Sequence, residues 1–109
     1  MSTTYTHIKG EIVVSAQLHC KPGQGNEVAA WIERLKEDAA VNEPGTIEYS
    51  FARDSPDGDV FAVWERFADV DAMKAHATAR LMQEFIRCDL LAKPPSHTFY
   101  CGRISGENA

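Results

Sequence analysis

The chain has 109 residues, of which 44% are hydrophobic and 25% are charged, as in an ordinary globular protein. This length provides for one hydrophobic core and is too short for two, so a single domain over residues 1–109 is predicted. The formal net charge is −5, and the 11 Lys and Arg residues are dispersed among acidic ones. This argues against nucleic acid as a partner, because phosphate binding needs clustered positive charge.

The apolar runs, the start of the chain and the cysteines indicate a cytoplasmic protein. No run approaches the roughly 18 apolar residues that a membrane span needs. The segment "MSTTYTHIKGE" lacks the basic start and the apolar stretch of a secretory signal, so neither secretion nor a membrane partner is expected. Cys20, Cys88 and Cys101 are an odd number with no C-x-x-C pair, and we expect reduced thiols.

The first predicted elements are a strand and an amphipathic helix. Residues 11–20, "EIVVSAQLHC", are β-branched and partly alternating, which is typical of a strand. Pro22 and Gly23 predict a turn, and Asn26 is the expected N-cap of the helix that follows. Pro44 in "NEPG" ends this helix. Its buried face is predicted from four apolar residues at helical spacing, Val28, Ile32, Leu35 and Ala39.

A β-hairpin is predicted next. Residues 46–53, "TIEYSFAR", alternate strictly and place Ile47, Tyr49 and Phe51 on one face. The segment "DSPDGD" is a turn cluster, and residues 60–67, "VFAVWERF", are the second strand of the hairpin.

The last predicted elements are a helical region and a fourth strand. Asp69 opens the helical region, which runs to about Leu91 with a break near Thr78. The segment "KPP" ends it, and residues 96–104, "SHTFYCGRI", form the strand. The order β-α-β-β-α-β predicts an α+β fold, a ferredoxin-like sandwich in which an antiparallel sheet has both helices on one face.

The sheet face that the helices leave uncovered is also predicted to be apolar. In "VFAVWERF", Phe61 and Val63 alternate with Val60, Ala62 and Trp64, so both faces of this strand carry apolar residues. Large exposed apolar patches usually mark interfaces, so we predict a homodimer in which two sheets pack face to face. The alternative is a half-apolar surface that remains in water.

Three segments, "NEPGTIEYSFARD", "VFAVWERFAD" and "DAMKAHATARLMQEF", follow one another in the order and spacing of a known family. In them the chain resembles the antibiotic biosynthesis monooxygenase (ABM) domain. That family has a Glu-Pro-Gly before a Tyr-containing strand, a Phe-x-x-x-Glu-x-Trp/Phe strand and an Ala-His in its second helix. The resemblance covers residues 12–104 and implies a dimeric α/β barrel, with a pocket in each subunit between sheet and helices.

The resemblance also implies a range of activities. Some members oxygenate aromatic phenols or quinols with molecular oxygen and neither metal nor flavin. Others degrade haem or process small signalling molecules. The haem-degrading members use an Asn in the first strand, where this chain has only Gln17.

His76, within "MKAHATARLMQEF", is the predicted catalytic residue. Met73, His76 and Ala77 share one side of the predicted helix, so the imidazole points toward the sheet. The position matches the Ala-His that lines the pocket in similar proteins. A neutral imidazole there would accept a phenolic proton, and the imidazolium would stabilise the anion left behind. The alternative is a hydrogen-bonded core histidine.

Five aromatic and apolar side chains are the predicted substrate-binding residues: Trp64, Tyr49, Phe51, Leu81 and Phe85. Trp64 and Tyr49 lie on neighbouring hairpin strands and would stack on a flat aromatic molecule, although core packing is the alternative role. The phenol of Tyr49 would hydrogen-bond a substrate oxygen. Leu81 stands where many relatives have a second histidine, which argues against a mechanism shared by two histidines.

Two further sets of polar residues receive structural interpretations. Glu65 is expected to pair with Arg53, Arg66 or Arg103, because burying an unpaired carboxylate is costly. His97 and Cys101 are four residues apart on one strand, about 13 Å, which is too far to bind one ion. No metal site is predicted.

The sequence favours a monooxygenase that acts on a small electron-rich aromatic molecule of the phenol or quinol type. It contains no flavin, nicotinamide or metal motif, so the enzyme would work without a cofactor and the substrate anion would itself reduce dioxygen. One alternative is a ligand-binding protein or an isomerase on the same fold. A haem-binding or haem-degrading protein is a less favoured one.

Overall fold

A computed structural model describes residues 3–103 of the chain. Its elements are β1 (Ile12–His19), α1 (Gly25–Asn42), β2 (Thr46–Arg53), β3 (Val60–Phe67), α2 (Val70–Ala77), α3 (Arg80–Arg87) and β4 (Ser96–Cys101). The two hairpin strands have the bounds that their alternating patterns predict. The fourth strand is shorter than predicted, and the end of that prediction, residue 104, lies outside the described residues.

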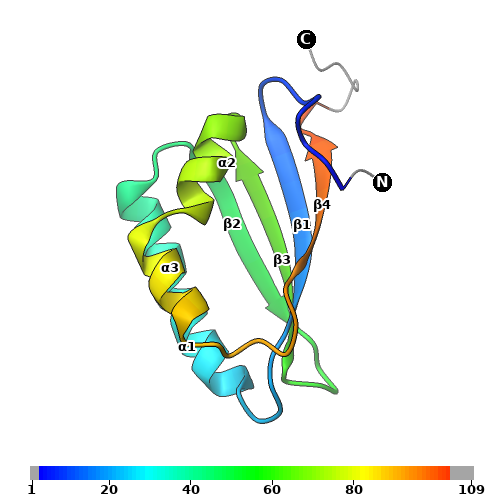
Figure 1. The fold of residues 1–109 in the computed structure, drawn as a ribbon, viewed down its shortest axis with the longest axis vertical. Coiled ribbons are helices and arrows are strands. Elements are labelled where there is room, and N and C mark those ends of the chain that lie inside the picture. The colour runs from blue at the N-terminus through cyan, green and yellow to red at the C-terminus, as the bar shows by residue number, and fades with distance from the viewer. Residues whose placement is uncertain (1–2, 104–109) are drawn as a thin grey trace.

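The strands form one antiparallel sheet in the order β2-β3-β1-β4. All three helices lie on the same side of this sheet (Figure 1). The predicted α+β, ferredoxin-like sandwich is therefore confirmed. Among residues 3–103, no helix is long and apolar enough to cross a membrane.

The strand register assigns each side chain of the sheet to one of two faces. On β3, Phe61, Val63, Glu65 and Phe67 are buried under the helices, whereas Ala62 and Trp64 are exposed on the other face. We call the face without helices the open face. Trp64 is 43% exposed there and Tyr100 of β4 is 37% exposed, and their rings stack with centroids 6.5 Å apart.

A β-bulge at the start of β2 changes one predicted orientation. The pairing of β2 with β3 shifts register between Thr46 and Glu48, so Ile47 falls out of the alternation. Its side chain is 55% exposed, whereas Tyr49 and Phe51 share one face as predicted, and this is the face that the helices cover.

The start of α1 also differs from the prediction. The N-cap position is Gln24, whose side chain makes no capping hydrogen bond, and Asn26 lies in the first turn. Asp59, in the turn between β2 and β3, accepts hydrogen bonds from the backbone N–H groups of Gly23 (3.0 Å) and Gly25 (2.9 Å). A carboxylate distant in sequence thus accepts from the N–H of Gly25, the first residue of α1, which has no partner within the helix.

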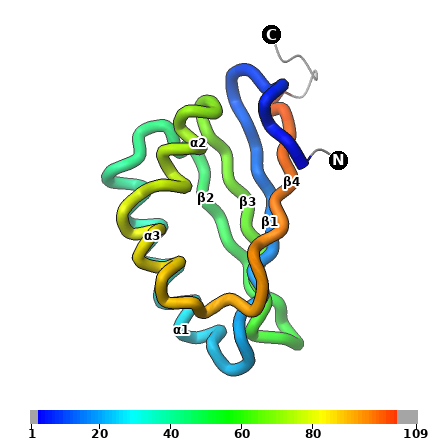
Figure 2. The backbone as a smooth tube through the Cα atoms, in the orientation of Figure 1, coloured from blue at the N-terminus to red at the C-terminus, as the bar shows by residue number. Residues whose placement is uncertain are grey.

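The predicted break in the second helical region is confirmed. Helix α2 ends at Ala77, and the Thr78 hydroxyl donates to the carbonyl of Lys74 (2.9 Å). Ala79 is extended, with φ −58° and ψ 146°, before α3 begins. The long connection from α3 then crosses the end of the molecule to reach β4 (Figure 2).

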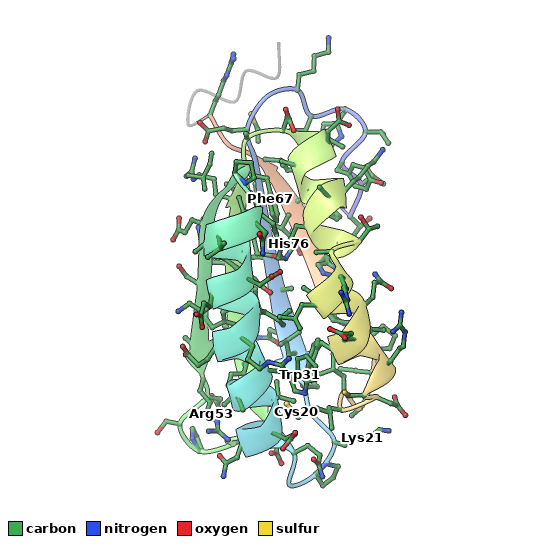
Figure 3. All side chains as sticks on the ribbon, turned by 90° about the vertical axis from the view of Figure 1, so that its left-hand side faces the viewer. Cys20, Lys21, Trp31, Arg53, Phe67 and His76 are labelled. Carbon is green, nitrogen blue, oxygen red and sulfur yellow. The ribbon has the colours of Figure 1, made fainter. Side chains whose placement is uncertain are left out.

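The interior consists of two hydrophobic clusters. One lies under α1 and α3 and includes Val28, Ile32 and Phe85. The other lies at the opposite end of the sheet and includes Ile12 and Phe67, with Ile8 of the N-terminal segment packed against them. Figure 3 shows Phe67 and His76 toward one end of the molecule and Cys20 and Arg53 toward the other.

Candidate functional site

A cavity of about 740 Å³ lies between the sheet and the helices α2 and α3. Two rows of helix-facing side chains form its floor, and each row contains one side chain from each of the four strands. The first row is Tyr49, Glu65, Val14 and Phe99, and the second is Phe51, Val63, Ala16 and His97. The size and the mostly apolar lining are typical of small-molecule sites.

One ionisable cluster lies beside this cavity, and two of its members, His76 and Glu65, line it. His76 of α2 lies between two carboxylates, with its Nδ1 2.7 Å from Glu43 Oε1 and its Nε2 2.9 Å from Glu65 Oε2. Glu43 directly follows α1, and its Oε1 also accepts a hydrogen bond from the Thr46 hydroxyl at 2.8 Å. His76 is 6% exposed and Glu65 is 7% exposed, so both are nearly withdrawn from water.

The two carboxylates determine the charge of His76. Burial alone lowers the pKa of His76, but the hydrogen bonds and charges of Glu65, and then of Glu43, outweigh burial and raise this pKa above its usual value. An imidazolium donates from both ring nitrogens, which matches a ring that has a carboxylate at each nitrogen. The raised pKa favours the protonated, cationic form of His76 between the two carboxylates.

Tyr49 completes this group. Its ring meets the His76 ring edge-on, with centroids 4.6 Å apart. Burial raises the pKa of Tyr49 well above its usual value, and the charges of Glu65 and Glu43 raise it further, so the phenol stays protonated. Within residues 3–103 its hydroxyl has no hydrogen-bond partner. It is thus a donor available to a ligand.

The structure brings some of the predicted substrate-binding residues together and separates others. Tyr49, Phe51 and Phe85 line the cavity with His76. Leu81 instead packs against the cluster under α1 and α3. Trp64 is on the open face, because Tyr49 is paired with Glu65 and the neighbour of Glu65 must point the opposite way.

The predicted partner of Glu65 was wrong. Arg66 pairs with Glu11 at 2.6 Å, and Arg53 donates to Asn26 and to the carbonyl of Gly58. Glu65 instead pairs with His76. An arginine on the same strand is the simplest expectation, but Arg66 lies next to Glu65 and so points to the other face.

Sequence reasoning also missed Glu43. Its "NEPG" segment was recognised as a helix end, yet nothing local indicates that this carboxylate folds onto a histidine 33 residues later. Among residues 3–103, no three His, Cys, Asp or Glu side chains are placed so that they could hold a metal ion.

Residues 11–87 match the family model for antibiotic biosynthesis monooxygenase, so the chain belongs to the ABM family. No curated protein matches it significantly. The family confirms the resemblance on which the predicted pocket rests.

Solved structures of the same fold have low sequence identity to this chain. A Caulobacter crescentus protein, named as a candidate antibiotic biosynthesis monooxygenase, is 24% identical over 88% of this chain and 92% of its own, with a TM-score of 0.78. A Nitrosomonas europaea protein of the same description is 16% identical over 92% and 98%, with a TM-score of 0.78. PA3566 from Pseudomonas aeruginosa is 19% identical over 89% and 98%, with a TM-score of 0.76.

Proposed function

We propose that this chain is a monooxygenase that oxidises a small electron-rich aromatic molecule of the phenol or quinol type with dioxygen, without a cofactor. The observation that supports it is a mostly apolar cavity lined by His76 and Glu65, which form a buried ionisable cluster with Glu43 behind them. The aromatic floor suits a flat ring, and the cluster suits removal of one proton from it. Membership of the ABM family agrees with this reaction class.

In this proposal Glu65 is the base, and not His76 as the sequence suggested. Both nitrogens of His76 already face carboxylates, so the imidazolium has no free position to accept a proton. Glu65 lies in the cavity wall and takes the phenolic proton. The positive charge of His76 and the hydroxyl of Tyr49 then stabilise the phenolate, while Glu43 holds His76 in place.

The chemical balance requires only the substrate and dioxygen. The phenolate transfers one electron to dioxygen, and the resulting radical pair combines to form a carbon–oxygen bond. Loss of water, made from the second oxygen atom and two substrate hydrogens, leaves a quinone. A naphthol thus becomes a naphthoquinone, and the apolar walls keep bulk water from the intermediates.

Oxygen uptake with a panel of phenols and naphthols tests the proposal. Glu65→Gln should reduce uptake about 100-fold or more, the usual contribution of a general base. Glu33→Gln is the matched control, because Glu33 is an exposed carboxylate of α1 that lies outside the cavity and away from the open face. No uptake above autoxidation, or equal uptake by the two variants, would contradict it.

An isomerase is the second candidate, because a carboxylate in contact with an imidazolium can move protons without oxygen. It would show as exchange of substrate protons with D₂O that depends on Glu65, with no oxygen uptake. The haem alternative finds less support: Gln17 lies exposed on the open face, outside the cavity.

A further inference from the structure

The side of the cavity formed by β4 differs in chemistry from the side that holds Glu65. Phe99 pairs with Val14, which pairs with Glu65, so Phe99 lies two strands away from Glu65 on the same face. Two strand spacings amount to about 10 Å. A ligand that touches Glu65 at one end therefore meets β4 at the other.

Aromatic and basic side chains form a continuous series along this β4 side. The ring of Tyr5 packs on Phe99 with centroids 5.2 Å apart, and the ring of His97 stacks on Phe99 with centroids 6.2 Å apart. Lys74 Nζ lies 6.0 Å from the centre of the Tyr5 ring. All four residues line the cavity, and so does Lys93 in the connection before β4.

The two lysines on this side of the cavity have no carboxylate partner among the described residues. Within residues 3–103, neither Lys74 nor Lys93 has an Asp or Glu oxygen within 4 Å. Asp89, the carboxylate that lines this part of the cavity, is paired with Lys21 at 2.7 Å. The opposite wall holds Glu65 and His76, which pair with each other. The lysines of the cavity that have no carboxylate partner therefore lie on its β4 side, in a chain whose net charge is −5.

We propose that the substrate is an aromatic hydroxy acid whose anionic group lies at the far end of the ring system from the reacting hydroxyl. The positive charges of Lys74 and Lys93, whose side chains are exposed, attract the anion to the β4 side of the cavity, and Tyr5 and Phe99 contact the ring. The orientation rests on the proposed function, because that function places the hydroxyl at Glu65. An anionic group on the other side would meet Glu65 and be repelled.

The test is equilibrium binding, which needs no turnover. The probes are 6-hydroxy-2-naphthoate, its neutral methyl ester, and 6-hydroxy-2-naphthalenesulfonate. Each is titrated by its own fluorescence into the protein at low and at high salt. The variants are Lys74→Gln, Lys93→Gln and the double substitution, with Lys36→Gln as the control because Lys36 is an exposed lysine of α1 outside the cavity.

We expect the naphthoate to bind about five-fold more tightly than its ester at low salt, with the advantage shrinking at high salt. The double variant should lose the advantage, while Lys36→Gln keeps it. A sulfonate that binds as well as the carboxylate would identify charge, and not carboxylate shape, as the selected feature. Equal binding of acid and ester, an advantage that survives the double substitution, or no binding of any probe would overturn the proposal. Anion-selective binding without oxygen uptake would instead reject the monooxygenase alone.

Discussion

At the scale of single residues, the placement of His76 between Glu43 and Glu65 has a consequence for stability. The pKa of His76 is raised in the folded protein relative to its ordinary value of 6.5, chiefly by Glu65 and then by Glu43 against the opposing effect of burial. The folded state therefore binds more protons than the unfolded state above that pH. The contribution of His76 to the free energy of unfolding is complete below pH 6.5 and is lost as the pH rises through the pKa of His76 in the folded protein.

We predict that the free energy of unfolding, measured by urea denaturation, falls as the pH is raised above 6.5. His76→Asn should flatten this slope, because the titrating group is gone. His19→Asn should keep it, since His19 lies on β1 and faces the open side of the sheet. An unchanged slope in His76→Asn would show that His76 does not hold an extra proton in the folded protein.

The residues of the site were only partly predictable from sequence. His76 stood out because the helix periodicity places its side chain toward the sheet, and Tyr49 stood out as an aromatic residue on a hairpin strand, although the alternation left its face undecided. Glu43 did not, because its partner is 33 residues away and the helix end that carries it has no periodicity. Trp64 was wrongly placed among the residues of the pocket. The pairing of β2 with β3 decides whether Trp64 or its neighbour Glu65 faces the helices, and the sequence does not reveal this register.

At the scale of elements, a long-range cap joins α1 to the hairpin. Asp59 accepts the N–H groups of Gly23 and Gly25 with its two carboxylate oxygens. The chain alone suggested Asn26, but the side chain of Asn26 accepts from Arg53 instead. Local preference identifies a helix start, and the folded neighbourhood decides which residue caps it.

We predict that Asp59→Ala lowers the free energy of unfolding by about 1–2 kcal/mol, the usual cost of losing a helix cap. The midpoint of chemical denaturation measures this loss. Glu33→Ala is the control, because Glu33 is exposed on α1. A midpoint shift no larger than that of Glu33→Ala would mean that Asp59 does not stabilise the start of α1.

At the scale of the whole molecule, the open face bears on assembly. Trp64 and Tyr100 are partly exposed on it and stack on each other. No helix among the described residues covers this face, which leaves it available to a second copy of the chain. The predicted homodimer, with two sheets face to face, remains our proposal.

Sedimentation velocity tests this assembly. We expect the unsubstituted chain to sediment as a dimer and Trp64→Asp to sediment as a monomer, because a charge would be buried between the sheets. Val41→Asp should remain a dimer, since Val41 is 75% exposed but lies on α1, away from the open face. A monomeric unsubstituted chain would contradict the proposal.

One measurement tests both the proposed activity and its base: turnover of a naphthol under ¹⁸O₂, analysed by mass spectrometry. Our account predicts that the quinone carries one ¹⁸O atom from dioxygen, and that Glu65→Gln forms little of this product while Glu33→Gln forms it normally. A quinone whose new oxygen comes from water, or labelled product that does not depend on Glu65, would contradict it.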